Sequence, residues 1–346
     1  MGNKKRATLI DRLERLPRVR LGQLPTPLER LDRLSNETGG AEIWVKRDDC
    51  TGLAFGGNKV RQLEYYLGQA RKAEADSVLI TGAVQSNFVR SCAAAAAKMG
   101  LECHIQLEER VPRDDEFYRQ SGNVLLDRLL GAQIYSYANG EDEAGADRRL
   151  GEIASDLRAA GKRPYIVPLS PGHPPFGALG YVAAAAELAA QLADQGLAPQ
   201  EIIVASGSGA THAGLLFGIR ALDLDIVVTG ICVRRDATAQ RQRIESRCQE
   251  IADLLQMDNP VRNHDLLLDD SYLAPGYGKL NAASKAALLA TARSEGLLLD
   301  PVYTAKPMAA CLDRAAAAQA GCKIIFIHTG GTPALFGYHA DLQTLF

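Results

Sequence analysis

The stretch FGGNKVRQLEYYLGQA, residues 55–70, places Lys59 after two glycines and an asparagine, in the first turn of a predicted helix. A cation is unfavourable at that point, because the helix dipole and the unpaired backbone N–H groups favour negative charge. Two interpretations are open. Either the side chain bends into water on its flexible stem, or it is partly desolvated, loses its proton more easily and serves as an amine nucleophile.

A second stretch, ASGSGATHAG at residues 205–214, joins a predicted strand to a predicted helix. Its glycines allow backbone N–H groups to converge, and its hydroxyls add donors at a helix N-terminus, which is typical of a phosphate-binding turn. A purely structural glycine turn is the alternative. The stretch lacks the lysine of a nucleotide P-loop, and His212 stands where a dinucleotide fingerprint has its third glycine. The predicted cradle comprises Ser206, Gly207, Ser208, Gly209, Ala210 and Thr211.

Two more strand-to-helix turns carry polar side chains. TGAVQSNFVRSC, residues 81–92, contains Gln85, Ser86 and Asn87, which are either helix caps or ligand-binding groups. HTGGTPALFGY, residues 328–338, contains Thr329. Because parallel strands end at one edge of a sheet, we expect these turns to share a pocket. An amine, a phosphate cradle and hydrogen-bonding turns together suit pyridoxal 5'-phosphate and an amino-acid substrate.

The elements that must position these residues alternate between short β-rich runs and longer, alanine-rich amphipathic ones. This alternation predicts an α/β fold with mostly parallel sheets and helices on both faces. The predicted strands are 42–46, 77–81, 102–107, 133–137, 164–169, 201–206, 225–233 and 323–331. The charged stretch at 138–152 is predicted to be a surface loop that leads into a helix.

Length and composition bound the class of protein. A chain of 346 residues suggests about two domains. A formal net charge of -2 with interleaved signs gives no basic face for nucleic acid and no polybasic membrane anchor. We see no signal peptide and no apolar run long enough to span a bilayer, so we expect a cytoplasmic protein. Seven cysteines without CxxC or CxxH spacing predict free thiols and no metal site.

With these motifs in order, the sequence resembles the pyridoxal-phosphate enzymes of the tryptophan-synthase-β type, known as fold type II. Within them it is similar to the D-cysteine desulfhydrase and 1-aminocyclopropane-1-carboxylate deaminase group. The resemblance runs through most of the chain and is carried by LPTPLERLDRLS (24–35), IWVKRDDCTGLAFGGNK (43–59), GAVQSN (82–87), GALGYV (177–182), ASGSGATHAG (205–214), PGYG (275–278), LLDPVYTAK (298–306) and HTGGTPALF (328–336).

The resemblance implies a homodimer of two-domain subunits, with a small domain at 55–169 inserted into a large one formed by 1–54 and 170–346. It makes Lys59 the residue that forms an imine with the cofactor and moves the α-proton. Asn87 would hydrogen-bond the phenolic oxygen of the cofactor, and residues 206–211 would hold its phosphate. Tyr303 would lie against the pyridine ring, with Thr304 and Thr329 also at the cofactor. The substrate would contact Gln85, Ser86, Asn87, Phe88 and Tyr277. Besides Lys59, the resemblance makes Ser86, Tyr277 and Tyr303 candidate catalytic residues.

Three positions bear on the substrate. The deaminase branch has a glutamate at the position of Thr304, close to the pyridine nitrogen, and a neutral hydroxyl there favours β-elimination over ring opening. Phe88 stands where the group usually has histidine, and SPGHPP at 170–175 replaces a shorter turn. If His173 faces the pocket, a more anionic substrate such as cysteate gains support. Because of Thr304, we nevertheless expect a lyase that converts D-cysteine to pyruvate, sulfide and ammonia.

Three alternatives stay open at this point. The first is an L-cysteate sulfo-lyase, which would release sulfite. The second is an aminocyclopropane-carboxylate deaminase, and the third is a silent protein that binds the cofactor or an amino acid without chemistry.

Overall fold

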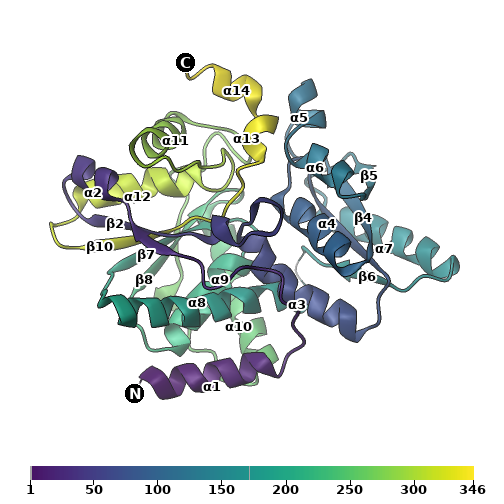
Figure 1. The fold of residues 1–346 in the computed structure, drawn as a ribbon, viewed down its shortest axis with the longest axis horizontal. Coiled ribbons are helices and arrows are strands. Elements are labelled where there is room, and N and C mark those ends of the chain that lie inside the picture. The colour runs from purple at the N-terminus through teal and green to yellow at the C-terminus, as the bar shows by residue number, and fades with distance from the viewer. Residues whose placement is uncertain (1, 171) are drawn as a thin grey trace.

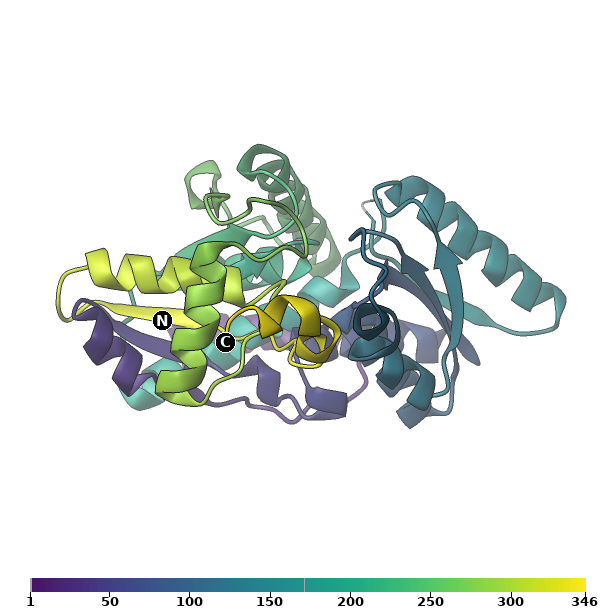
Figure 2. The ribbon, with the colours of Figure 1, turned by 90° about the horizontal axis from the view of Figure 1, so that it is seen from above.

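The computed structural model describes residues 2–170 and 172–346 and contains two sheets, one in each of two lobes (Figure 1, Figure 2). The larger sheet has the strand order β1-β2-β10-β7-β8-β9, and only its β1–β2 pair is antiparallel. Its strands are β1 (Leu28–Arg30), β2 (Glu42–Lys46), β7 (Glu201–Ser206), β8 (Val227–Cys232), β9 (Leu267–Asp269) and β10 (Lys323–Ile327).

Helices cover both faces of this sheet, because its central strands are apolar on both sides. In β7, Ile202 and Val204 pack against α8 (Phe176–Gln195), α9 (Ala210–Ala221) and α10 (Ala237–Leu255). Ile203, one residue out of step, points the other way. It packs with α2 (Asp32–Thr38), α11 (Ala282–Glu295) and α12 (Ala305–Ala317).

The smaller sheet is parallel throughout, with the strand order β5-β4-β3-β6. Its strands are β3 (Ser77–Ala83), β4 (Glu102–Glu108), β5 (Gln133–Tyr137) and β6 (Pro164–Val167). One face packs on α4 (Asn87–Met99) and the other on α7 (Glu143–Ala159). All four strands lie inside the range expected for the small domain, although the domain boundaries themselves stay a prediction.

Helix α3 (Asn58–Lys72) lies between the two lobes and packs against α8 on one side and α4 on the other (Figure 1). The remaining elements are α1 (Gly2–Glu14), η1 (Asp48–Cys50), η2 (Leu53–Phe55), α5 (Glu116–Gln120), α6 (Asn123–Leu129), η3 (Asn263–Asp265), α13 (Ala334–Gly337) and α14 (His339–Gln343).

The α/β fold with mostly parallel sheets is confirmed, and each of the eight predicted strands is present, three with the predicted ends and five with ends shifted by one to four residues. Sequence patterns missed β1 and β9, because each has only three residues, LER and LLD, and includes charged side chains. All seven cysteines are free thiols, as expected.

The expectation that no segment is long and apolar enough to span a bilayer was wrong for α8. Its 20 residues meet that criterion by length and composition. In this fold α8 is instead a core helix, packed between α3 and α9. An apolar surface on several sides is what such a central helix requires.

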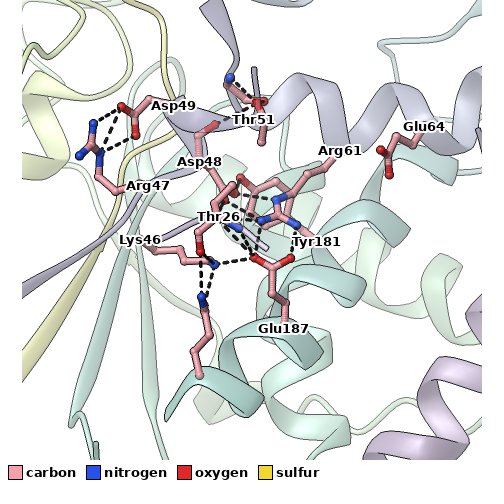
Figure 3. Close-up of polar contacts among 12 residues, drawn as sticks. Thr26, Lys46, Arg47, Asp48, Asp49, Thr51, Arg61, Glu64, Tyr181 and Glu187 are labelled. Carbon is pink, nitrogen blue, oxygen red and sulfur yellow. Dashed lines mark hydrogen bonds and ion pairs between the residues drawn. The ribbon is translucent and has the colours of Figure 1, made fainter. Parts of the chain in front are cut away.

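A buried charge network holds α3 to the larger lobe (Figure 3). The guanidinium of Arg61 donates to both oxygens of Asp48, at 2.9 and 3.0 Å, and to both oxygens of Glu187, at 2.8 and 3.0 Å. The Lys46 ammonium lies 2.5 Å from Glu187. Two cations thus face two carboxylates, and the hydroxyls of Thr26 and Tyr181 donate to Asp48 as well.

We predict that Asp48→Asn lowers the free energy of unfolding by about 3 kcal/mol, because removal of one charge from a buried pair leaves the other uncompensated. Urea denaturation followed by circular dichroism measures the change. Asp32→Asn is the matched control, since the Asp32 side chain is 70% exposed beside Arg30 and its loss costs less than about 1 kcal/mol. Equal destabilisation by the two substitutions would contradict the prediction.

Candidate active site

The predicted turns meet at one cavity between the two lobes, where β3 and β7 end and α3, α4 and α9 begin. Parallel strands and the helices that follow them bring these chain segments to a common edge. The structure places the following predicted residues on the cavity wall: Lys59, Ser86, Asn87, Phe88, Gly207, Ser208, Gly209, Thr211, Tyr277, Tyr303 and Thr329.

Lys59 lies in the first turn of α3, as predicted, and its ammonium has no carboxylate partner among the described residues. Its Nζ atom lies 3.3 Å from the side-chain oxygen of Gln62 and 4.7 Å from the centre of the Phe88 ring. Desolvation lowers the pKa of Lys59 to about 8. The structure therefore supports the interpretation in which Lys59 is desolvated. Part of the Lys59 amine is deprotonated near pH 7.

The turn after β7 forms the start of α9, a 12-residue helix without a side-chain N-cap. Its first N–H groups are left for a ligand, and Gly209 adopts the positive φ of +96° that this turn requires. The Thr211 hydroxyl accepts hydrogen bonds from the amides of Asn58 and Gln62, both at 2.8 Å. Because both its lone pairs are used, its proton is available for an anion in the cavity.

Two predicted members of the cradle do not place their side chains on the cavity wall. The Ser206 hydroxyl lies 3.1 Å from the His212 ring and accepts from Gln240 at 2.8 Å, so these contacts give no support to the prediction that it binds a phosphate. As the last residue of β7, Ser206 points to the opposite side from its neighbours. Ala210 begins α9, and its methyl group is not on the cavity wall.

Gln85 was predicted to contact the substrate, but it is not on the cavity wall and its side chain is engaged by other parts of the protein. The amide donates to the carbonyls of Tyr118, at 2.7 Å, and Ser121, at 3.0 Å, and accepts from the Asn123 N–H at 2.9 Å. These backbone groups are buried and need partners. The Gln85 side chain therefore fastens the turn before α4 to the chain around α5 and α6.

Ser86 and Asn87 do face the cavity. The Ser86 hydroxyl caps α4 by accepting from the Val89 N–H at 3.3 Å, which leaves its own proton free to donate. The two interpretations of this turn, cap and ligand contact, are thus compatible in one residue.

Thr304 was predicted to contact the cofactor, but it is not on the cavity wall. Its hydroxyl donates to the Asp300 carboxylate at 2.7 Å and accepts from the Asp300 N–H at 2.6 Å. This is a local turn in which Asp300 also accepts from the N–H groups of Val302 and Tyr303. The ranking of elimination over ring opening therefore gains no support from a direct Thr304 contact.

The two predicted tyrosines form a pair. The hydroxyls of Tyr277 and Tyr303 lie 2.6 Å apart, and their rings meet edge to face. Burial raises the pKa of Tyr303 well above its usual value. Tyr303 is therefore protonated at neutral pH, and because the contact between the two hydroxyls uses one proton, the other is left to donate a hydrogen bond into the cavity.

The two departures from the group's usual sequence, Phe88 and the SPGHPP segment, lie in different places. Phe88 lines the cavity beside Lys59. His173 is 49% exposed and lies 3.7 Å from Asp147, and it is not on the cavity wall. The SPGHPP segment thus gives no direct support for an anionic substrate; Pro171 within it lies outside the described residues.

Sequence analysis missed a charged cluster on the cavity wall. Glu143 from α7 pairs with Arg234 at 2.8 Å, with Arg235, and with Arg243 at 3.3 Å. Arg235 and Arg243 also donate to the carbonyls of residues 207 and 208, at 3.2 and 2.9 Å. Three guanidinium groups thus face one carboxylate beside the cradle.

The stretch 138–152 was predicted to be a surface loop that leads into a helix; the helix begins at Glu143, and Glu143 lies on the cavity wall, which was not predicted. The only signal in the sequence was the arginine pair directly after a predicted strand. Arg110 is a further cation of the cavity wall and is paired with Glu108 at 2.7 Å.

These groups fit pyridoxal phosphate. A readily deprotonated amine is present for its carbonyl, and an uncapped helix with a free hydroxyl proton is present for its phosphate. The excess of guanidinium groups beside the cradle complements a dianion.

A two-domain α/β fold with this lysine and cradle defines an enzyme class that holds a phosphorylated carbonyl cofactor. Residues 19–330 match the family of pyridoxal-phosphate dependent enzymes, and the chain belongs to that family.

Relatives and solved structures agree with this assignment. The chain is 44% identical over 338 residues to a D-cysteine desulfhydrase of Yersinia pestis (strain Pestoides F), covering 97% of this chain and 100% of the relative. It is 42% identical to a D-cysteine desulfhydrase of Klebsiella pneumoniae, covering 96% and 99%. A solved homologue of ACC deaminase has a TM-score of 0.87 at 36% identity, covering 98% and 99%. O-ureido-L-serine synthase, at 16% identity and a TM-score of 0.66 over 95% and 94%, shares the fold.

We predict that Lys59 in cofactor-free protein reacts with acetic anhydride with a pH midpoint near 8, because only the neutral amine is nucleophilic. Reactivity rises as the pH passes this value. Mass spectrometry of peptides measures the modified fraction at each pH. Lys162, whose pKa is raised by its contact with Glu102, is the internal reference. A Lys59 midpoint equal to that of Lys162 would show that desolvation does not activate the amine.

We predict that Thr211→Val weakens pyridoxal phosphate binding about tenfold, because it removes a hydroxyl donor to a charged group while conserving side-chain volume. Equilibrium dialysis of the cofactor-free protein measures the Kd. Ser206→Ala is the matched control and should change the Kd less than twofold, since that hydroxyl faces His212 and Gln240. The prediction fails if the two substitutions have the same effect.

Proposed function

We propose that this enzyme is a lyase that converts D-cysteine and water to pyruvate, hydrogen sulfide and ammonia. The observation that carries the proposal is Lys59, a desolvated amine of lowered pKa on the same cavity wall as Ser86 and the tyrosine pair. The relatives named D-cysteine desulfhydrase, which match almost the whole chain, support the choice of substrate and enantiomer.

Each of these residues has a task that its surroundings suit. When bound, pyridoxal phosphate supplies the electron sink for negative charge that develops at the substrate α-carbon. Lys59, neutral in part near pH 7, accepts the α-proton. The free proton of Ser86 binds the substrate carboxylate. Tyr277, backed by Tyr303 at 2.6 Å, donates a hydrogen bond to the departing sulfur.

A specific observation favours a second substrate for the same site. Arg110, Arg234 and Arg243 all line the cavity, and Glu143 is the lining residue that pairs with two of them. A sulfonate on the substrate β-carbon would be attracted by this excess of positive charge. L-cysteate, with sulfite as the leaving group, is therefore the second candidate.

For the assembly and location of the protein we propose a homodimer in the cytoplasm. The likeness to the desulfhydrase and deaminase group supports the dimer, and the seven free thiols support a reducing compartment such as the cytoplasm. Light scattering of the purified protein tests the oligomeric state, and a tagged chain observed in its own cells tests the location.

The test is to identify, by mass, the keto acid and sulfur product that purified enzyme forms from D-cysteine, L-cysteine, L-cysteate and 1-aminocyclopropane-1-carboxylate in separate assays. We expect pyruvate and sulfide from D-cysteine. We also expect Lys59→Ala to lower turnover at least a thousandfold, since both the base and the cofactor attachment are lost.

The other outcomes separate the alternatives. Pyruvate and sulfite from L-cysteate alone would assign the site to the second candidate, and 2-oxobutyrate would assign it to ring opening. A change in the visible spectrum without any keto acid would identify a silent binding protein. Wild-type turnover by Lys59→Ala would overturn the role of this lysine.

A further inference from the structure

Asn123 lies beneath the turn that carries Ser86 and Asn87, at the start of α6, and is completely buried. It is not on the cavity wall, and it is absent from the motifs that identified the site. Its side-chain amide contacts three groups: the guanidinium Nε of Arg90 at 3.2 Å, the carbonyl of Gln85 at 3.0 Å and the side-chain oxygen of Asn87 at 2.9 Å.

The chemistry of these neighbours determines the orientation of both amides. Arg90 Nε–H can only donate, so the side-chain oxygen of Asn123 must face it. The Gln85 carbonyl can only accept, so Asn123 Nδ2 must lie on that side. Asn123 Nδ2 donates to Asn87 as well, and Asn87 must therefore present its oxygen to Asn123. The Nδ2 group of Asn87, a donor only, is left for the cavity.

We propose that Asn123 is a positioning residue that fixes the side-chain amide of Asn87 as a hydrogen-bond donor to the phenolic oxygen of pyridoxal phosphate. Without this contact, Asn87 could present either its oxygen or its nitrogen to the cavity. An oxygen there would repel a phenolate, whereas an N–H group stabilises it. The proposal depends on the cofactor of the family and not on D-cysteine as the substrate.

Arg90 extends the same unit to the catalytic lysine. Its guanidinium donates to the carbonyl of Ala54 and, at 3.1 Å, to that of Gly56, in the glycine turn just before α3. Arg90 thus links the hydrogen-bonded side chains of Asn123 and Asn87 to the turn that precedes Lys59. Arg90 therefore contacts both the residue that orients Asn87 and the turn that precedes Lys59.

The neighbouring Asp127 provides a matched control. It is buried beside Arg90, and neither of its carboxyl oxygens has a hydrogen-bond partner among the described residues. Desolvation raises the pKa of Asp127 to about 8, so the group is largely neutral at pH 7. Asp127→Asn changes the same cluster without entering the chain of contacts that orients Asn87.

The discriminating substitution is Asn123→Asp. A carboxylate of the same shape still accepts from Arg90, which offsets its charge, but it can donate neither to Asn87 nor to the Gln85 carbonyl, and only the loss at Asn87 distinguishes the two ligands used below. The Asn87 amide then turns its nitrogen toward the carboxylate and its oxygen toward the cavity. The effect should appear only with a ligand that carries the phenolic oxygen.

The experiment measures the Kd of cofactor-free protein for pyridoxal phosphate and for its 3-deoxy analogue, which lacks that oxygen, by equilibrium dialysis at pH 7. We expect Asn123→Asp to weaken pyridoxal phosphate about tenfold and the 3-deoxy analogue less than twofold. Asp127→Asn should leave both values within twofold of wild type.

A purely structural role for Asn123 would weaken both ligands equally, and that result would overturn the proposal, as would no change with either. If Asn123→Asp does not fold, Asn123→Ala decides by the same comparison, with an expected loss of about threefold for pyridoxal phosphate alone. Neither measurement requires turnover, so a failure of the proposed substrate would leave this result intact.

Discussion

Arg61 is buried two residues beyond Lys59, and its guanidinium must be neutralised inside the protein because desolvation of an unpaired cation costs many kcal/mol. Asp48, from the segment after β2, and Glu187, from α8, supply the two carboxylates. This arrangement ties α3 to the larger sheet and to its central helix (Figure 3). The position of Lys59 therefore depends on an ion-pair network that does not itself enter the cavity.

The need to pair polar groups that lose water also explains how the two lobes form one site. Asn58 and Gln62 of α3 donate to Thr211 at the start of α9. Glu143 of the smaller lobe pairs with arginines of the larger lobe. Each contact satisfies a polar group that partly loses water when the lobes meet. The cofactor site is consequently assembled from both lobes, and its charge and donor pattern exist only when they are together.

Much of this site could be predicted from the sequence because its motifs are local. A glycine turn between a strand and a helix, a lysine in a first helical turn and a serine-asparagine turn each have a physical meaning within ten residues. The side chains of Gln85, Ser206 and Thr304, which were predicted at the ligands, lie off the cavity wall for a common reason. A polar side chain in a turn can satisfy either a ligand or a buried backbone group, and the choice depends on neighbours that are distant in the sequence.

The sequence by itself determined the α/β class, the strands that end in glycine turns, and the amine and cradle that suit pyridoxal phosphate, because backbone geometry and hydrophobic periodicity are local properties. Only the tertiary structure decided which hydroxyls and amides face the cavity. It also brought Glu143 to Arg234, ninety-one positions away, and placed Asn123 behind Asn87. Such contacts depend on how two sheets and the helix between them pack, which no short stretch of residues encodes.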